Sequence, residues 1–141
     1  MNAIEITQCT SEEADIIIDG INNYNKGYVI SDIPKRRTPF EFAIKNPDGE
    51  IIAGILAGMG CYGGLEINIL WVKEGKRQSG IGTTLLLETE KRAKEAGAII
   101  SLLDTFDFQA KDFYLKNGYS IFGQVNNFPT GHTRYYLQKR L

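Results

Sequence analysis

The stretch KRQSGIGTTLL, Lys76 to Leu86, contains two glycines one residue apart, just before a run with helical spacing. A helix is predicted over Ser79 to Ala96, where small and apolar residues share one face and Gly97 follows as a stop. The first turn of a helix carries unpaired N–H groups and the positive end of the dipole, which favour a bound phosphate. The stretch therefore predicts either an anion-binding loop or a plain turn into a helix.

Two familiar phosphate-binding loops do not fit this stretch. A dinucleotide-binding fingerprint requires a third glycine where the chain has Leu85, and a loop that follows its strand directly, whereas polar residues 73–76 intervene here. Asp104 stands where that fingerprint would place its acidic residue, so the imitation is partial. A P-loop requires Gly-Lys followed by Ser or Thr after a four-residue gap, and that pattern is absent.

Three segments together resemble the GNAT superfamily of N-acetyltransferases. The loop RQSGIG, Arg77 to Gly82, is similar to the family's pyrophosphate-binding motif Q/R-x-x-G-x-G/A. LEINILWV, Leu65 to Val72, resembles the strand that precedes this loop, and QAKDFYLKNGY, Gln109 to Tyr119, resembles the family's late helix and following turn. The segments stand in the family's order and spacing across Gly64 to Tyr119. The chain is therefore identified as a member, and the resemblance implies that the anion is coenzyme A.

The hydrophobic pattern of the rest of the chain is compatible with this resemblance. The predicted order is strand, helix, three-strand meander, helix, strand, helix and two strands, which indicates a mixed sheet in one domain. The resemblance implies an α/β (α+β) fold of the GNAT type, with a mixed, mostly antiparallel sheet of about six to seven strands and helices on both faces. Residues 1–141 are predicted to form a single N-acetyltransferase domain. Strands are predicted at Ala3–Thr7, Phe40–Ile44, Glu50–Met59, Leu65–Lys73, Ala98–Leu103, Tyr119–Val125 and Thr133–Gln138, and helices from Thr10 or Ser11, over Ser79–Ala96 and over Gln109–Asn117.

The composition fits a globular domain and excludes several classes of function. Hydrophobic residues make up 43% and charged residues 23% of the 141, a balance typical of a packed domain. The formal net charge of −1 gives no global attraction to nucleic acid or an anionic membrane, and no apolar run reaches the length of a membrane span. One histidine and two distant cysteines make no metal-ligand set. Cysteine usage and an N-terminus without a signal-peptide pattern predict a cytoplasmic location.

The resemblance also implies which residues hold coenzyme A. In the family, backbone N–H groups of the loop and first helical turn bind the pyrophosphate, and a basic side chain can neutralise its charge. The strand before the loop splays from its neighbour, and its freed backbone groups bond the pantetheine amides. Gln109 stands where the family usually has an asparagine that contacts the pantetheine. The implied contacts are Leu70, Trp71 and Val72 on the strand, Arg77, Gln78, Ser79, Gly80, Ile81, Gly82 and Thr83 in the loop and helix, and Gln109.

Two residues are candidate catalysts by the same resemblance. Tyr114, in FYLKNGY, matches the position of a tyrosine that protonates the departing thiolate of coenzyme A. Glu66 matches a general-base glutamate, which is needed because most amines are protonated at pH 7. A water chain, or His132 in the turn FPTGHTRYY, is an alternative base, and Glu66 could instead only bind a cationic substrate.

Alternation along LEINILWV predicts which side chains of this strand share a face. One predicted face carries Leu65, Ile67, Ile69 and Trp71, and the other carries Glu66, Asn68, Leu70 and Val72. The face with Glu66 is expected to look toward the acceptor amine.

The function implied by the resemblance is transfer of an acetyl group from acetyl-CoA directly to a primary amine of a small molecule, without an acyl-enzyme. Two alternatives stay open: a protein or peptide amine acetyltransferase, and a non-catalytic coenzyme A-binding sensor module. The presence of both Glu66 and Tyr114 argues against the sensor. The sequence does not identify the acceptor, the length of the acyl chain or the oligomeric state, although homodimers are common in the resembling group.

Overall fold

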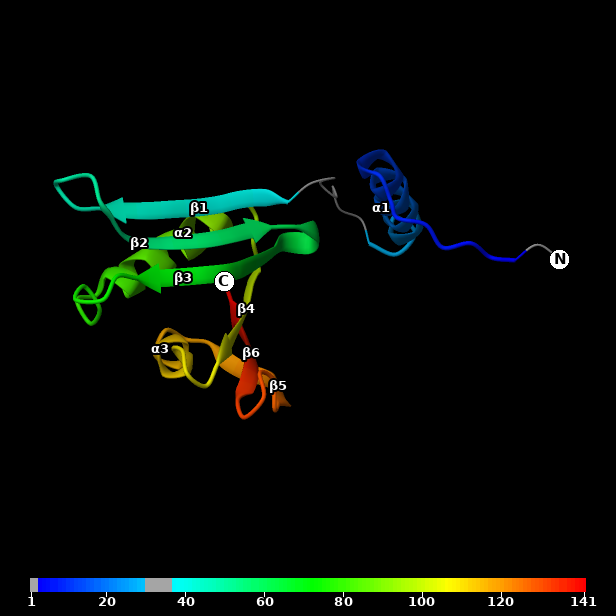
Figure 1. Ribbon diagram of the computed structural model, residues 1–141. Helices are drawn as coiled ribbons and strands as arrows, with labels where there is room; N and C mark the ends of the chain where they lie inside the picture. Colours follow the sequence, from blue (N-terminus) through cyan, green and yellow to red (C-terminus); the bar gives the residue numbers. More distant parts are fainter. Residues whose placement is uncertain (1–2, 30–36) are drawn as a thin grey trace. The chain divides into compact units, whose positions relative to one another are not determined.

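The computed structural model describes residues 3–29 and 37–141. The chain divides into two compact units, residues 1–35 and residues 36–141. The described part of the first unit contains one helix, whereas the second contains the sheet and every residue predicted to bind coenzyme A or to catalyse (Figure 1). That the whole chain forms a single domain stays a prediction.

The N-terminal unit is organised around helix α1, Ser11–Asn25. Thr10 caps this helix: its side-chain oxygen accepts a hydrogen bond from the backbone N–H of Glu13 at 3.2 Å, and the Glu13 carboxylate accepts one from the Thr10 N–H at 2.9 Å. This capping box confirms the predicted helix start. The strand predicted at Ala3–Thr7 is wrong, because residues 3–10 have no regular secondary structure and pair with none of the described strands.

The larger unit is built on a six-stranded sheet with the order β1-β2-β3-β4-β6-β5 (Figure 1). Every neighbouring pair is antiparallel except β3 and β4, which are parallel and are joined by a crossover helix. This mixed, mostly antiparallel sheet confirms the predicted fold class. The strands are β1 Thr38–Lys45, β2 Ile51–Met59, β3 Gly64–Val72, β4 Ile100–Phe106, β5 Ser120–Asn126 and β6 Thr133–Arg140.

The helices of this unit contribute buried side chains to its hydrophobic core. A short 3₁₀ turn, η1 Cys61–Gly63, joins β2 to β3, helix α2 Ile81–Glu95 joins β3 to β4, and helix α3 Lys111–Lys116 precedes β5. Helix α2 packs against β1, β2 and β3. One cluster of buried side chains joins these elements, including Ile55 and Leu65 from the sheet, Leu86 from α2 and Tyr114 from α3.

A buried hydrogen-bond network fixes α2 relative to the far strands of the sheet. Glu90 of α2 is only 5% exposed, and its carboxylate accepts hydrogen bonds from the Tyr119 hydroxyl at 2.7 Å and from the Lys139 ammonium at 2.6 Å. The Tyr119 hydroxyl also lies 2.7 Å from the hydroxyl of Ser101. Burial raises the pKa of Tyr119, so this hydroxyl keeps its proton. A buried charge is tolerated only when it is paired, and these bonds therefore hold α2, and the loop at its start, in one position.

Strand β3 contains a β-bulge at Asn68. Ala57 of β2 pairs with Ile67, and the next residue back, Leu56, pairs with Ile69, so Asn68 is an extra residue without a partner in β2. The extra residue reverses the alternation of side chains, and the predicted strict alternation is wrong beyond Ile67. The side chains on the core side are Leu65, Ile67, Leu70 and Val72, and those on the opposite side are Glu66, Ile69 and Trp71.

Candidate functional site

Strands β3 and β4 separate beyond their first four paired residues. Their parallel pairing runs from Gly64 with Ile100 to Ile67 with Leu103 and then stops. Strand β3 nevertheless continues to Val72, and β4 continues to Phe106. The two strands therefore leave a gap in the middle of the sheet, which confirms the splay that the resemblance implied.

The bulge decides which backbone groups of β3 face this gap. In an antiparallel ladder, alternate residues direct their N–H and C=O groups to the same neighbour. The Lys73 N–H donates to the Ile52 carbonyl of the β2 side at 2.8 Å, so the backbone of Trp71 also faces β2. The backbones of Leu70 and Val72 then face the gap. Of the three strand residues predicted to bond pantetheine, Leu70 and Val72 have the required direction, whereas Trp71 has only its half-exposed indole to offer.

The loop before α2 has the backbone shape of an anion-binding nest. Gln78 has φ 63° and Gly80 has φ 83°, so two left-handed residues flank Ser79. The first intrahelical bond runs from the Thr84 N–H to the Gly80 carbonyl at 3.0 Å, and no side chain caps the helix. The N–H groups of Ile81, Gly82 and Thr83 consequently have no intrahelical partner, and no acidic residue stands in the first turn. These residues fit a bound diphosphate.

The two basic side chains nearest the nest are engaged differently. The Arg77 Nε donates to the Val72 carbonyl at 3.0 Å, so Arg77 links the nest to the end of β3 and satisfies one of the carbonyls that face the gap. Lys73 instead pairs with Glu50, and this hydrogen bond, together with the lysine charge, lowers the pKa of the Glu50 carboxyl. Of these two side chains, Arg77 can bring a guanidinium toward a phosphate, whereas the Lys73 ammonium is held by Glu50.

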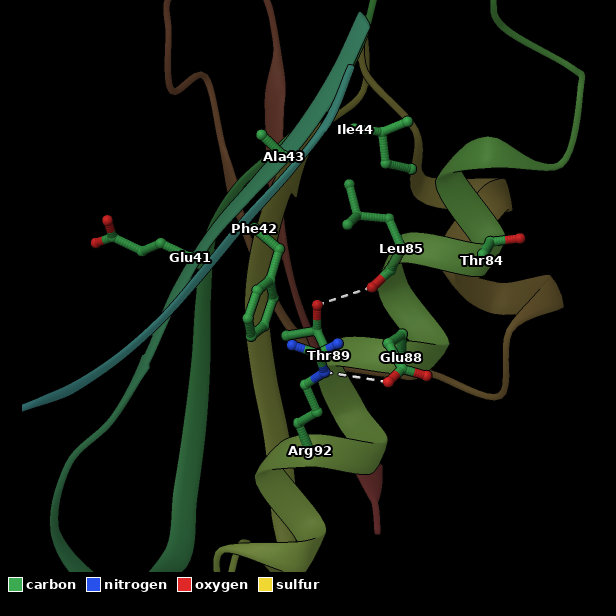
Figure 2. Close-up of a pocket in the computed structure, with 9 residues that line it drawn as sticks. All are labelled: Glu41, Phe42, Ala43, Ile44, Thr84, Leu85, Glu88, Thr89 and Arg92. Carbon is green, nitrogen blue, oxygen red and sulfur yellow. Dashed lines mark hydrogen bonds and ion pairs between the residues drawn. The ribbon is translucent and has the colours of Figure 1, made fainter. Parts of the chain in front are cut away.

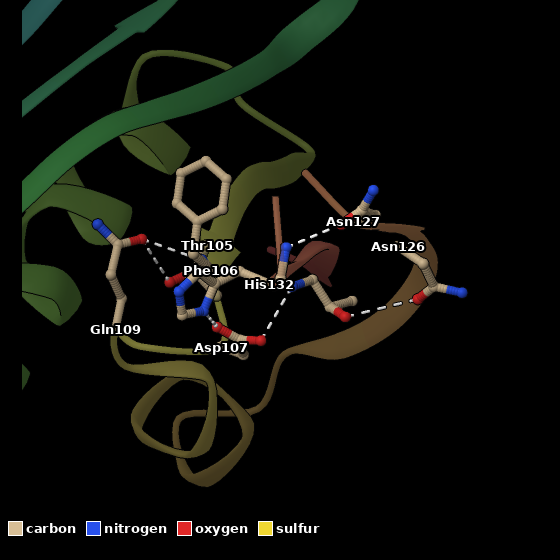
Figure 3. Close-up of polar contacts among 9 residues, drawn as sticks. Thr105, Phe106, Asp107, Gln109, Asn126, Asn127 and His132 are labelled. Carbon is tan, nitrogen blue, oxygen red and sulfur yellow. Dashed lines mark hydrogen bonds and ion pairs between the residues drawn. The ribbon is translucent and has the colours of Figure 1, made fainter. Parts of the chain in front are cut away.

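Gln109 lies directly after the open end of β4. Its side-chain oxygen accepts hydrogen bonds from the Phe106 N–H at 2.9 Å and from the Thr105 hydroxyl at 3.2 Å (Figure 3). The amide oxygen is therefore used to close the turn after β4. A contact between Gln109 and pantetheine has to come from the amide nitrogen.

Tyr114 of α3 is buried in the hydrophobic core of the larger unit. Its side chain is 7% exposed and packs edge-on against the rings of Phe113 and Tyr119, at centroid distances of 5.2 and 5.7 Å. Burial, and to a smaller extent the charge of Asp104, raises the pKa of Tyr114 to about 12. The hydroxyl therefore remains protonated at neutral pH and can act as a donor.

Helix α3 lies close to the start of α2 at Gly82. A Cβ at Gly82 would lie 3.5 Å from the Phe113 ring and 3.5 Å from the Val72 side chain. The start of α2, the end of β3 and the ring next to Tyr114 are therefore in close proximity. Glu66 lies on the opposite, exposed side of β3, in register with Leu102 of β4. The two predicted catalysts thus lie on opposite faces of the sheet.

His132, predicted as an alternative base, has a partner just beyond the end of β4 that was not predicted, Asp107. His132 Nδ1 lies 2.8 Å from Asp107 Oδ1, and the other Asp107 oxygen accepts the Thr133 N–H at 2.9 Å (Figure 3). The Thr133 N–H and then His132 lower the pKa of the Asp107 carboxyl. His132 is thereby held against β4 and is not a free turn residue. The chain order of Asp107 after a predicted parallel strand was the signal that could have indicated it.

A salt bridge on the exposed side of β4 was missed as well. Arg134 of β6 pairs with Asp104 of β4 at 2.8 Å. Its guanidinium also lies over the rings of Phe106, Phe128 and Tyr136, at 5.6, 5.6 and 5.2 Å. This side of the gap therefore presents aromatic rings and a carboxylate close to the open end of β4.

A hollow of the larger unit lies elsewhere, between β1 and α2 (Figure 2). It has a volume of about 450 Å³ and contains none of the residues predicted to bind coenzyme A or to catalyse. Phe42 on one wall lies under the guanidinium of Arg92 at 4.6 Å, and Arg92 also pairs with Glu88 at 3.1 Å. Among residues 3–29 and 37–141, no group of His, Cys, Asp and Glu side chains is arranged to hold a metal. Within the same ranges, no helix combines the length and the apolar character that crossing a membrane requires.

Comparison with known proteins agrees with this geometry. The family model of the acetyltransferase (GNAT) domain matches residues 40–121, which include β3, the nest and α3. The chain belongs to the GNAT family of acetyltransferases. It is 38% identical over 91 residues to a blasticidin-S acetyltransferase from Streptomyces morookaense, covering 64% of this chain and 67% of the relative.

Solved GNAT structures confirm the fold of this family member. An acetyltransferase from Bacillus cereus superposes with a TM-score of 0.83 at 36% identity, covering 98% of both chains. An aminoglycoside 6'-N-acetyltransferase complexed with coenzyme A superposes with a TM-score of 0.63 at 24% identity, covering 71% of both chains. Acetyl-CoA, the expected co-substrate, is confirmed at the level of the family, because proteins of this fold hold coenzyme A or acetyl coenzyme A in their crystals.

Proposed function

We propose that this GNAT acetyltransferase transfers an acetyl group from acetyl-CoA directly to a primary amine of a small molecule. The observation that supports it most is the gap between β3 and β4 beside the uncapped start of α2. A diphosphate bound at the nest would direct the rest of the cofactor along the gap-facing backbone of Leu70 and Val72. The proposed cofactor contacts are those two residues, Arg77, the backbone from Gln78 to Thr83 and the Gln109 amide nitrogen; an indole contact from Trp71 is retained as a proposal.

Three groups of the chain are proposed to assist the transfer. Glu66 accepts the proton that the amine loses as the new C–N bond forms. The Leu70 N–H donates a hydrogen bond to the carbonyl oxygen of the acetyl group, where negative charge develops. Tyr114 donates its proton to the sulfur as the C–S bond breaks, which its pKa of about 12 permits because the hydroxyl is protonated throughout the neutral range.

A small basic acceptor is favoured by the relatives and by the exposed side of the gap. Two similar proteins are acetyltransferases of blasticidin-S and of aminoglycosides. The Glu66 and Asp104 carboxylates and the Phe106 ring lie on the side from which an amine would approach, and carboxylates and rings attract cations. Acceptance of a protein amine, and cofactor binding without catalysis, are the alternatives that the following experiment has to exclude.

The test is the release of free thiol from acetyl-CoA with a panel of amines, polyamines, aminoglycosides, nucleoside antibiotics and peptides. We expect turnover with a small amine and none with peptides. Replacing Tyr114 by Phe or Glu66 by Gln is expected to lower kcat about 100-fold, the usual contribution of a positioned acid or base, while the Kd for coenzyme A stays unchanged. Tyr62→Phe, at an exposed tyrosine in η1, is the matched control and is expected to behave as wild type.

The outcomes separate the alternatives. Full activity of Tyr114→Phe would remove the acid role, and activity on peptides alone would favour a protein acceptor. Coenzyme A binding without turnover on any amine would indicate a sensor module. Tyr114 loses its proton only near pH 12, so its deprotonation should not slow the wild-type enzyme below about pH 10. The pH profiles of wild type and Tyr114→Phe should therefore have the same shape in that range. A cytoplasmic location and a homodimer stay predictions, to be checked by fractionation and by mass in solution.

A further inference from the structure

Arg37 lies across β2 and bonds to β3 on both sides of the start of the bulge. One terminal nitrogen of its guanidinium donates to the Glu66 carbonyl at 2.9 Å and to the Asn68 side-chain oxygen at 2.5 Å. Gly58, the β2 partner of Glu66, makes this path available. A Cβ at Gly58 would lie 2.3 Å from the Arg37 Nε, so any larger residue would displace the side chain. We call these two hydrogen bonds the Arg37 clasp.

The clasp holds β3 at the point where its other supports end. The pairing of β3 with β4 stops at Ile67, and Asn68 has no partner in β2. The bulge residue is therefore held by neither neighbouring strand, and Arg37 bonds to its side chain. A charged donor makes such bonds stronger than those between neutral groups.

The bulge in turn determines the direction of the amide proposed to stabilise the oxyanion. In a regular strand without the bulge, the backbone N–H and C=O groups would point alternately to β2 and to the gap along the whole of β3. The Trp71 amide, rather than the Leu70 amide, would then face the gap. The position of Leu70 within the gap therefore depends on the conformation at Asn68. Misplacing such a group by about 1 Å costs up to about 100-fold in rate.

We propose that Arg37 is a positioning residue for acetyl transfer, which acts by holding the bulge so that the Leu70 N–H points into the gap. This inference rests on the proposed function. Arg37 makes its bonds at Glu66 and Asn68 and not in the nest, so it contributes to the transfer step and not to the binding of the diphosphate.

The test separates kcat from KM in two variants that break the same contact from opposite ends. Arg37→Ala removes the guanidinium, and Gly58→Ala displaces it without changing Arg37 itself. We expect each to lower kcat about 10- to 100-fold, with the KM for acetyl-CoA and the Kd for coenzyme A within about twofold of wild type. The double variant should lose no more than either single one, because both remove one interaction.

A matched control tests whether any alanine in β2 has the same effect. A Cβ at Gly54, in the same strand, would meet only the Phe42 carbonyl at 3.5 Å, an ordinary contact. Gly54→Ala should therefore keep the wild-type kcat. Guanidinium ion added to Arg37→Ala should restore part of the lost rate, and it should not restore Gly58→Ala, where the Cβ fills the path.

The proposal is overturned if Arg37→Ala lowers kcat while Gly58→Ala does not, because Arg37 would then act by some contact other than the clasp. It is equally overturned if neither changes kcat, if both raise the Kd for coenzyme A, or if the losses add in the double variant. A backbone NMR experiment keeps the test independent of turnover: acetyl-CoA should shift the Leu70 amide resonance in wild type and Gly54→Ala, and much less in Arg37→Ala and Gly58→Ala. If the wild type turns over no amine but its Leu70 amide resonance still shifts with acetyl-CoA, the proposed function is refuted and the role of the Arg37 clasp in positioning Leu70 is not. Equal shifts in all four proteins would refute the role of the clasp.

Discussion

The two halves of strand β3 have the same neighbour on one side and different surroundings on the other. Gly64–Ile67, the closed half, is bonded to β2 and to β4, and Leu65 and Ile67 are buried. Ile69–Val72, the open half, is bonded to β2 alone, and Ile69 and Trp71 are about half exposed. One strand can therefore hold the fold together where it is paired on both sides and offer unpaired backbone to a ligand where it is paired on one side only. A bulge at Asn68 separates the two roles.

The largest expected effect comes from breaking the closed half. Leu65 is fully buried, so Leu65→Ala should lower the free energy of unfolding by about 2–5 kcal/mol. The loss has two sources: the hydrophobic transfer free energy of the removed atoms, and the cavity that remains because the surrounding sheet relaxes only in part. Ile69→Ala, in the open half, removes a side chain that is 53% exposed and should cost less than about 1 kcal/mol. Urea unfolding of the two variants measures both values. Equal losses would mean that the open half is as tightly packed as the closed half.

A second effect is expected at the nest, which follows the open half. Gly80 has φ 83° and open space around it, so Gly80→Ala meets no clash but forces a left-handed alanine, at about 1–2 kcal/mol. The nest should reshape to relieve this strain, and the Kd for coenzyme A measured by calorimetry should rise about tenfold. Gly75→Ala is the matched control, because Gly75 also has a positive φ, 86°, and open space around it but is not one of the proposed cofactor contacts. Equal weakening of binding in both variants would mean that backbone strain anywhere in this loop, and not the shape of the nest, raises the Kd.

The parts of this protein that depend on local sequence were predicted correctly. Thr10 and Glu13 form a capping box three residues apart, and α2 follows a helical pattern that ends at glycine. These features require only neighbours along the chain, which the sequence displays directly. The loop before α2 and Tyr114 were assigned roles through motifs whose residues also lie close together in sequence, and those roles stay predictions.

The mixed, mostly antiparallel sheet was predicted, but several details of pairing between distant segments were not. The bulge arises because Leu56 and Ala57 of β2 take up three residues of β3, and nothing in LEINILWV alone indicates this. The strand predicted at Ala3–Thr7 had the right composition and no partner in the described sheet. The contacts of Arg37 with Asn68 and of Asp107 with His132 join residues 31 and 25 positions apart, and the sequence does not display such pairings.

The smallest expected effect distinguishes the two basic residues at the end of the open half. Arg77 is bonded to the last carbonyl of β3 and lies within the nest, so Arg77→Ala should raise the Kd for coenzyme A several-fold, more at low than at high salt because the contact is electrostatic. Lys73 is occupied by Glu50, and Lys73→Ala should leave that Kd within about twofold of wild type, since an exposed ion pair contributes little. Calorimetric titrations at two salt concentrations would measure both. If Lys73→Ala raised the Kd for coenzyme A more than twofold, Lys73 would have to leave Glu50 and contact the bound cofactor. The part of the chain that binds the cofactor would then include Lys73, one residue beyond the end of β3.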